Sequence, residues 1–182
     1  NFTAPALKQG EYEQIRLVAD SVARAAFAAY QKVEHRDGVS LAAAEREIEL
    51  GVRKPTEADV ARAKEILAAA KGPVLKTLPE VYARETMLLM DYPSTVRARM
   101  QAMRVGELGI AAIPCEVFVE IGLTIKKESP LKPTFTVSLA NGYNGYLPTP
   151  EHHRLGGYET WRARSSYLEV DASTKITKSM LG

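Results

Sequence analysis

The first stretch of the chain carries apolar residues at helical spacing. Between residues 11 and 33 they recur every three or four positions, which predicts an amphipathic helix. The recurring residues are Ile15, Val18, Ala19, Val22, Ala26, Ala29 and Tyr30. Residues 44–52 instead alternate weakly between apolar and polar side chains, a period that indicates a strand.

Two further helices are predicted from the residues that begin them. Thr56 can cap a helix, with Asp59 at the third position after it. Thr77 can cap the next helix, with Pro79 in its first turn, where the missing N–H costs little. A Gly-Pro pair ends the first of these helices and a Tyr-Pro pair ends the second. Residues 1–92 are therefore predicted to be mainly helical.

The hydrophobic period changes to that of strands after residue 93. Residues 96–102 alternate between apolar and polar side chains, and residues 108–113 form an apolar run. Gly106-Glu107 between them is a tight turn, so the two segments predict a hairpin. Residues 134–139 are apolar and β-branched, which predicts a further strand.

Helices are also predicted in this second part. One covers residues 117–127 and begins directly after Glu116, and a short last helix follows a cap at Asp171 or Ser173. The whole pattern predicts a mixed α/β (α+β) fold, in which a helical first half packs on a mixed sheet. Residues 93–182 supply strands, helices and a loop rich in candidate site residues.

Composition narrows the class of protein. At 182 residues, 46% of them apolar and 25% charged, the chain fits one ordinary globular domain. A net charge of +2 gives no electrostatic reason to expect nucleic acid as a partner. Cys115 is the sole cysteine, so an internal disulfide is excluded. No apolar run approaches the roughly 20 residues of a transmembrane segment. The compartment is left open, with a secreted or periplasmic parent protein as one option.

Candidate chemistry concentrates in one loop region. Asn141-Gly-Tyr-Asn-Gly-Tyr-Leu-Pro-Thr-Pro-Glu151 is followed by Gly156-Gly-Tyr-Glu159, so three tyrosines lie among residues that favour turns. Such a loop on a rigid scaffold is a typical place for a functional site. Two alternatives stay open from the residues alone. The three tyrosines can be core aromatics, and Glu116 can be a plain helix cap.

The histidines and the cysteine are weaker candidates for a functional site. His152 and His153 are adjacent, so they do not face the same way on a helix and are poorly placed to share one metal ion. Cys115 lies in an apolar strand, which indicates a small core residue rather than a nucleophile. The metalloprotease, phosphate-loop, serine-hydrolase and dinucleotide motifs are absent from the sequence.

Three segments together resemble the neutral/alkaline (non-lysosomal) ceramidase family. They are Pro114-Cys-Glu116, Leu139-Ala-Asn-Gly-Tyr-Asn-Gly-Tyr-Leu-Pro-Thr-Pro-Glu151 and Gly157-Tyr-Glu159. The family consists of zinc-dependent amidohydrolases that cleave the N-acyl amide bond of ceramide. The resemblance implies that residues 1–182 are the C-terminal portion of such a catalytic domain.

The resemblance also implies roles for individual residues. Glu116 and Tyr146 match zinc ligands of the family. Tyr158 matches a tyrosine that stabilises the oxyanion at the scissile amide. The loop residues implied to bind substrate or to support the ligands are Asn141, Tyr143 and Glu159.

The sequence departs from the family pattern beside these positions. Cys115 replaces a glycine, and the segments 117–122 and 160–162 differ from the family's. The implied substrate is therefore ceramide or a related N-acyl lipid amide. The two zinc histidines of the family lie in an N-terminal half, so that half is the expected partner. We expect the isolated chain to be inactive and to self-associate as a homo-oligomer. The alternative is a non-catalytic lipid-binding or association module that retains the fold.

Overall fold

The computed structural model divides the chain into two compact units. One unit extends to Val39, and the other extends from Ser40 to Gly182. The residues that the structure describes are 10–35, 37–72 and 74–182. The first unit contains helix α1 (Glu13–Tyr30), which confirms the first predicted helix. Within the described ranges, no helix combines the length and the apolar character needed to cross a bilayer.

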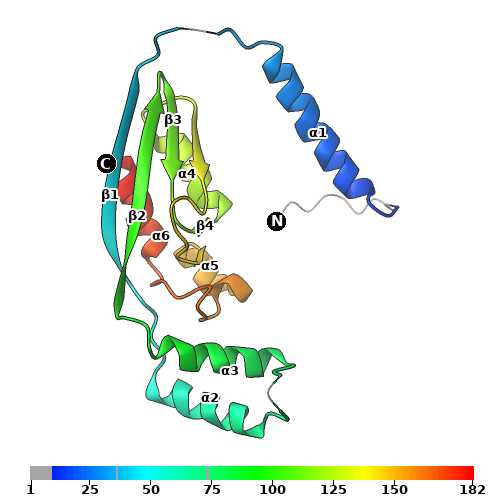
Figure 1. The fold of residues 1–182 in the computed structure, drawn as a ribbon, viewed down its shortest axis with the longest axis vertical. Coiled ribbons are helices and arrows are strands. Elements are labelled where there is room, and N and C mark those ends of the chain that lie inside the picture. The colour runs from blue at the N-terminus through cyan, green and yellow to red at the C-terminus, as the bar shows by residue number, and fades with distance from the viewer. Residues whose placement is uncertain (1–9, 36, 73) are drawn as a thin grey trace. The chain divides into compact units, whose positions relative to one another are not determined.

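The second unit is built on a four-stranded mixed sheet (Figure 1). Its strands, in spatial order, are β1 (Leu41–Gly51), β2 (Thr95–Val105), β3 (Leu108–Ala112) and β5 (Thr134–Val137). The strands β1, β2 and β3 pair in antiparallel fashion, and β5 adds to β3 in parallel. All four predicted strands and the hairpin turn at Gly106-Glu107 are confirmed, although β5 ends two residues before its predicted end.

Helices α2 (Glu57–Ala69) and α3 (Leu78–Leu89) form a helical hairpin. Each begins with a capping box, in which Thr56 pairs with Asp59 and Thr77 pairs with Glu80. Reciprocal caps of this kind satisfy backbone N–H groups that have no partner inside the helix. At the other end of α3, the ammonium group of Lys54 donates to the carbonyl oxygen of Leu89, at 2.9 Å, and to two carbonyls beyond it. Both helices were predicted, the first from Thr56 and Asp59 and the second from Thr77 and Pro79.

The main core lies between the sheet and helices α4 (Val119–Glu128) and α6 (Ala172–Leu181) (Figure 1). Its fully buried side chains include Leu50, Leu89, Met100, Ile113, Ile125, Leu147 and Ile176. The mixed fold class is confirmed. The sequence predicted that the helical first half packs on the sheet. Within the second unit, α4 and α6 make the larger contacts with the sheet, and α3 contributes Leu89 to the same core. In α2 and α3 only Ala63, Ala83, Glu85 and Leu89 are buried, so their own apolar surface is too small to cover a sheet.

The prediction that a helix begins directly after Glu116 is wrong. Glu116–Val117 form the short strand β4, which pairs in parallel with β6 (Tyr146–Leu147), and α4 begins at Val119. The backbone N–H of Glu116 donates to the carbonyl of Gly145 at 2.9 Å, so it is already part of a strand pair. Glu116 is therefore not a helix cap. Likewise, α6 begins after Asp171, but the Asp171 side chain makes no capping hydrogen bond.

Candidate functional site

The two-stranded β4–β6 pair places Glu116 directly opposite Tyr146. These residues are 30 positions apart in the sequence, and the pairing is fixed by the backbone on both sides. Glu116 N–H bonds to Gly145, and Tyr146 N–H donates to the carbonyl of Ser165 at 2.8 Å. The two residues implied to be zinc ligands therefore lie side by side, with their backbone positions set by three separate segments of the chain.

The loop that leads to Tyr146 depends on left-handed backbone conformations. Leu139 has φ +55°, Asn141 has φ +59° and Gly145 has φ +74°. Asparagine tolerates this region better than most residues, and glycine carries no steric penalty there. A Cβ on Gly145 would lie 2.4 Å from the Ser165 carbonyl oxygen, so only glycine fits this close approach.

Asn141 takes a different role from the other implied site residues. Its side-chain N–H donates to Oε1 of Gln101 on β2 at 2.6 Å. The structure therefore places Asn141 against the sheet, where it helps to fix the start of the loop. The role of Asn141 in substrate binding or in support of the ligands stays a prediction.

Two further tyrosines surround the Glu116–Tyr146 pair. The Tyr143 hydroxyl donates to Oε1 of Glu116 at 3.3 Å. The ring of Tyr158 lies edge-to-face against that of Tyr146, with 5.7 Å between centroids, and the two phenols are hydrogen-bonded. Tyr143 and Tyr158 are each 55% exposed, so the interpretation of them as core aromatics is wrong. The structure thus brings together Glu116, Tyr143, Tyr146 and Tyr158.

The surroundings raise the pKa of two of these phenols. For Tyr146 the hydrogen bond with Tyr158 contributes most, followed by burial and by the charge of Glu116, and the pKa reaches about 12. The pKa of Tyr143 is raised first by burial and then by Glu116. Tyr146 is therefore neutral at pH 7. A divalent cation beside Glu116 would reverse this bias, because a bound cation favours the anionic form of a nearby ligand.

The short 3₁₀ helix η1 (Tyr158–Thr160) brings Glu159 and Trp161 toward helix α3. Tyr82 of α3 packs edge-to-face on Trp161, with centroids 5.2 Å apart. Burial raises the pKa of Tyr82, followed by the negative charges of Glu85 and Glu159. Glu159 therefore lies near Tyr82 and directly follows Tyr158, and its supporting role stays a prediction. Sequence reasoning missed Tyr82, because no local pattern links α3 to the loop.

An open groove of about 500 Å³ adjoins the tyrosine cluster. It lies between α3 and the segment 163–167 and shares Tyr143 with the cluster. Its lining is mostly apolar and aromatic, from Leu78, Val81, Tyr82, Tyr92, Tyr143 and Tyr167, with Glu85 and Arg164 at one side. Such a groove can hold an apolar chain beside the phenols.

His152 and Cys115 lie outside this cluster. Helix α5 (Pro150–Leu155) carries His152, whose Nδ1 is 2.7 Å from the Thr149 hydroxyl and whose ring packs on Phe118. Cys115 is fully buried, and burial raises the pKa of its thiol to about 12, which confirms it as a core residue. Among the residues that the structure describes, no group of three or more His, Cys, Asp or Glu side chains could hold a metal ion.

Comparison with known proteins connects the chain to one fold. No protein-family model matches it, and no curated protein matches it. The neutral ceramidase from Pseudomonas aeruginosa superposes with a TM-score of 0.56 and 16% identity, over 100% of this chain and 34% of the ceramidase. A structure described as ceramidase complexed with C2 gives a TM-score of 0.41 and 18% identity, over 63% of this chain and 20% of that one.

The likeness to neutral ceramidase confirms, at the level of the fold, the resemblance predicted from the sequence. The chain spans about a third of the length of that enzyme.

Proposed function

We propose that this chain is the C-terminal part of the catalytic domain of a zinc-dependent amidohydrolase. Its substrate would be the N-acyl amide bond of ceramide or of a related N-acyl lipid. The observation that carries the proposal is the pairing of Glu116 with Tyr146, with Tyr143 and Tyr158 in contact with them. The fold supports it, because it matches that of a neutral ceramidase.

The donor set fits half of a zinc site. Glu116 offers a carboxylate and Tyr146 offers a phenol, and both are oxygen donors that zinc accepts. Catalytic zinc sites use three protein ligands or more, so the remaining ligands would be histidines from another segment of the same enzyme. When bound, zinc lowers the pKa of a coordinated water toward about 7, which supplies hydroxide at neutral pH.

The chain's own residues would prepare the site for amide hydrolysis. Tyr143 donates to Glu116 and so fixes the orientation of its carboxylate. The exposed phenol of Tyr158 can donate a hydrogen bond to the oxygen that gains negative charge when an amide carbonyl is attacked. One such donor typically contributes about 2.7–4 kcal/mol to stabilisation of the transition state. The adjoining groove would hold the apolar part of the lipid.

Replacement of Tyr158 by phenylalanine should separate catalysis from metal binding. The change keeps the ring that packs on Tyr146 and removes the hydroxyl that would donate to the oxyanion. In the enzyme that contains this chain, we expect kcat on an N-acyl lipid to fall by about 10²–10³, with zinc content unchanged. Steady-state kinetics and metal analysis measure the two effects. An unchanged kcat would reduce Tyr158 to a packing residue.

The 182-residue chain alone should bind zinc weakly and show no amidase activity. It supplies two oxygen donors, and proton release from Tyr146 opposes binding because its pKa is about 12. Isothermal titration with zinc measures the affinity, and His152→Ala and His153→Ala serve as controls. Tight binding in a one-to-one complex that either control abolishes would show that the site is local and contradict the split-site proposal.

Zinc content and lipid turnover of the enzyme that contains this chain distinguish the alternative function. A lipid-binding or association module would bind N-acyl lipid without turnover, even when the zinc-binding segment is present. If the enzyme that contains this chain holds zinc and hydrolyses an N-acyl lipid, the module is excluded. If it binds lipid but neither holds zinc nor turns over, the module replaces the enzyme as the conclusion.

A further inference from the structure

Two arginines of the segment that follows Tyr158 are paired with acids of the helical hairpin. The guanidinium of Arg162 lies 2.8 Å from Asp59 of α2. The guanidinium of Arg164 bonds to both oxygens of Glu85 of α3, at 2.8 and 2.9 Å. Each helix of the hairpin thus contributes one acid to the same short segment.

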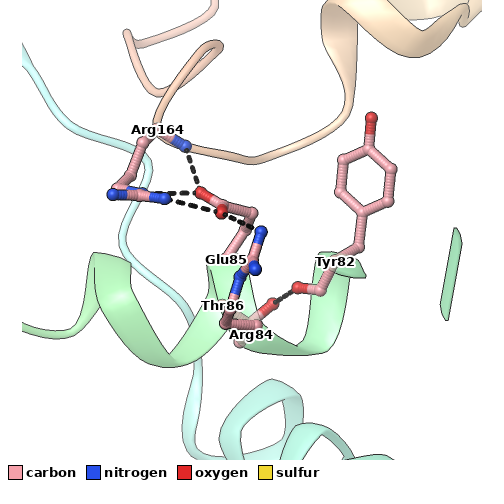
Figure 2. Close-up of polar contacts among 5 residues, drawn as sticks. All are labelled: Tyr82, Arg84, Glu85, Thr86 and Arg164. Atoms are coloured by element: carbon pink, nitrogen blue, oxygen red, sulfur yellow. Dashed lines mark hydrogen bonds and ion pairs between the residues drawn. The ribbon is translucent and has the colours of Figure 1, made fainter. Parts of the chain in front are cut away.

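The Glu85–Arg164 contact is the more specific of the two (Figure 2). Besides the two guanidinium bonds, the backbone N–H of Arg164 donates to Oε2 of Glu85 at 3.3 Å. Glu85 is only 8% exposed, and the hydrogen bonds from Arg164 lower its pKa, so it is charged at neutral pH. The Glu85 carboxylate accepts both a bidentate guanidinium and a backbone N–H. It therefore fixes the orientation of the backbone at Arg164 as well as its distance from α3.

The same segment is also held by Arg53, which follows strand β1. Its guanidinium donates to the carbonyl oxygens of Thr160, Ser166 and Leu168, at 2.7–2.8 Å. The Ser166 hydroxyl in turn donates to the carbonyl of Glu159 at 2.6 Å. Arg53 and the hairpin therefore both hold the segment.

The held segment bonds to the backbone of Tyr146 and to the backbone of the residue that follows Tyr158. Ser165, directly after Arg164, accepts the backbone N–H of Tyr146 at 2.8 Å. Glu159, which accepts from Ser166, directly follows Tyr158. A shift of the 164–166 backbone would therefore move Tyr146 and Tyr158 relative to each other.

We propose that Glu85 and Arg164 are positioning residues that hold Tyr146 and Tyr158 in contact through Ser165 and Ser166. Neither Glu85 nor Arg164 touches the two phenols, so both act through the backbone of residues 164–166. The inference that this contact serves catalysis rests on the proposed function. The positioning itself is a property of this chain and can be measured without metal or substrate.

The test is an NMR measurement on the 182-residue chain with labelled tyrosines and no zinc. Edge-to-face rings with centroids 5.7 Å apart place ring protons close enough for cross-peaks between Tyr146 and Tyr158. We expect Arg164→Leu to abolish these cross-peaks. Arg164→Lys should weaken them, because an ammonium group retains the charge but not the bidentate fork.

Two further variants separate positioning from stability. Glu85→Leu combined with Arg164→Leu removes the buried carboxylate together with its guanidinium partner. Arg84, which also pairs with Glu85, stays half exposed to water, so the fold should survive even if Arg164→Leu alone does not fold. The cross-peaks should still be lost there. Arg154→Leu breaks the exposed pair with Glu151 on α5 and should leave them unchanged.

The NMR result tests the positioning proposal separately from the proposed function. Cross-peaks that persist in the folded double variant would overturn the proposal, whether or not zinc binds in the complete enzyme. Cross-peaks that disappear there but persist in Arg154→Leu would support it, even if the zinc titrations contradict the proposed function.

Discussion

Glu116→Gln or Tyr146→Phe should remove zinc and nearly all turnover from the enzyme that contains this chain. Each change keeps the shape of the side chain and deletes the group that can carry a negative charge toward the metal. The two side chains lie opposite each other in the β4–β6 pair, so loss of either leaves one donor from this chain. Metal analysis of the purified variants and kinetics on an N-acyl sphingosine measure both effects.

Tyr143→Phe is the matched control for these two variants. Tyr143 is a phenol of the same loop, and its hydroxyl bonds to Glu116 rather than acting as a proposed ligand. Loss of such a supporting partner typically costs about 10–100-fold in metal affinity or activity, with the site still formed. Full zinc occupancy in both Glu116→Gln and Tyr146→Phe would rule out the ligand assignment.

The elements that the sequence predicted well are those set by local signals. The capping boxes that begin α2 and α3 involve residues three positions apart, and the hairpin of β2 and β3 closes on a two-residue turn at Gly106-Glu107. The physical causes of these elements lie within a few residues of one another. Their positions could therefore be read from the chain before any tertiary contact was known.

The elements that the sequence missed depend on contacts between distant segments. Strand β4 exists because Glu116 pairs with a residue 30 positions later, and the apolar spacing of the residues after it looked like a continuous helix. The packing of α4 and α6 on the sheet is likewise decided by tertiary burial. Periodicity indicates an apolar face but does not identify the surface that will cover it.

The candidate site was predicted in part, and from two kinds of information. The residue pattern alone left Glu116 and the tyrosines open between structural and chemical roles, and the family resemblance assigned them. The structure then placed Glu116, Tyr146 and Tyr158 in one cluster. It added Glu85 and Arg164, whose pairing spans 79 positions and gives no signal in the sequence.

Gly145→Ala should destabilise the chain and disturb the Tyr146–Tyr158 contact. Gly145 has φ +74°, where an L-residue costs roughly 1–2 kcal/mol. The new Cβ would also lie 2.4 Å from the Ser165 carbonyl, which must move away from Tyr146 N–H. Loss of that hydrogen bond adds about 0.5–1.5 kcal/mol. We therefore expect the free energy of unfolding to fall by about 1.5–3.5 kcal/mol, measured by chemical denaturation.

Gly156→Ala is the control for Gly145→Ala. It introduces backbone strain without the steric contact that a Cβ on Gly145 would make with Ser165. Gly156 has φ +86°, in the same unit of the chain, but a Cβ there would meet no heavy atom within 4 Å. Its ψ of −169° places it in a region that is essentially restricted to glycine, so we expect backbone strain of about 1–3 kcal/mol there, with the tyrosine cross-peaks intact. Retention of the Tyr146–Tyr158 cross-peaks in both variants would show that the approach of Gly145 to Ser165 does not position the site. Loss of the cross-peaks in Gly145→Ala alone would identify this backbone contact as the point through which the segment after Tyr158 sets the position of Tyr146.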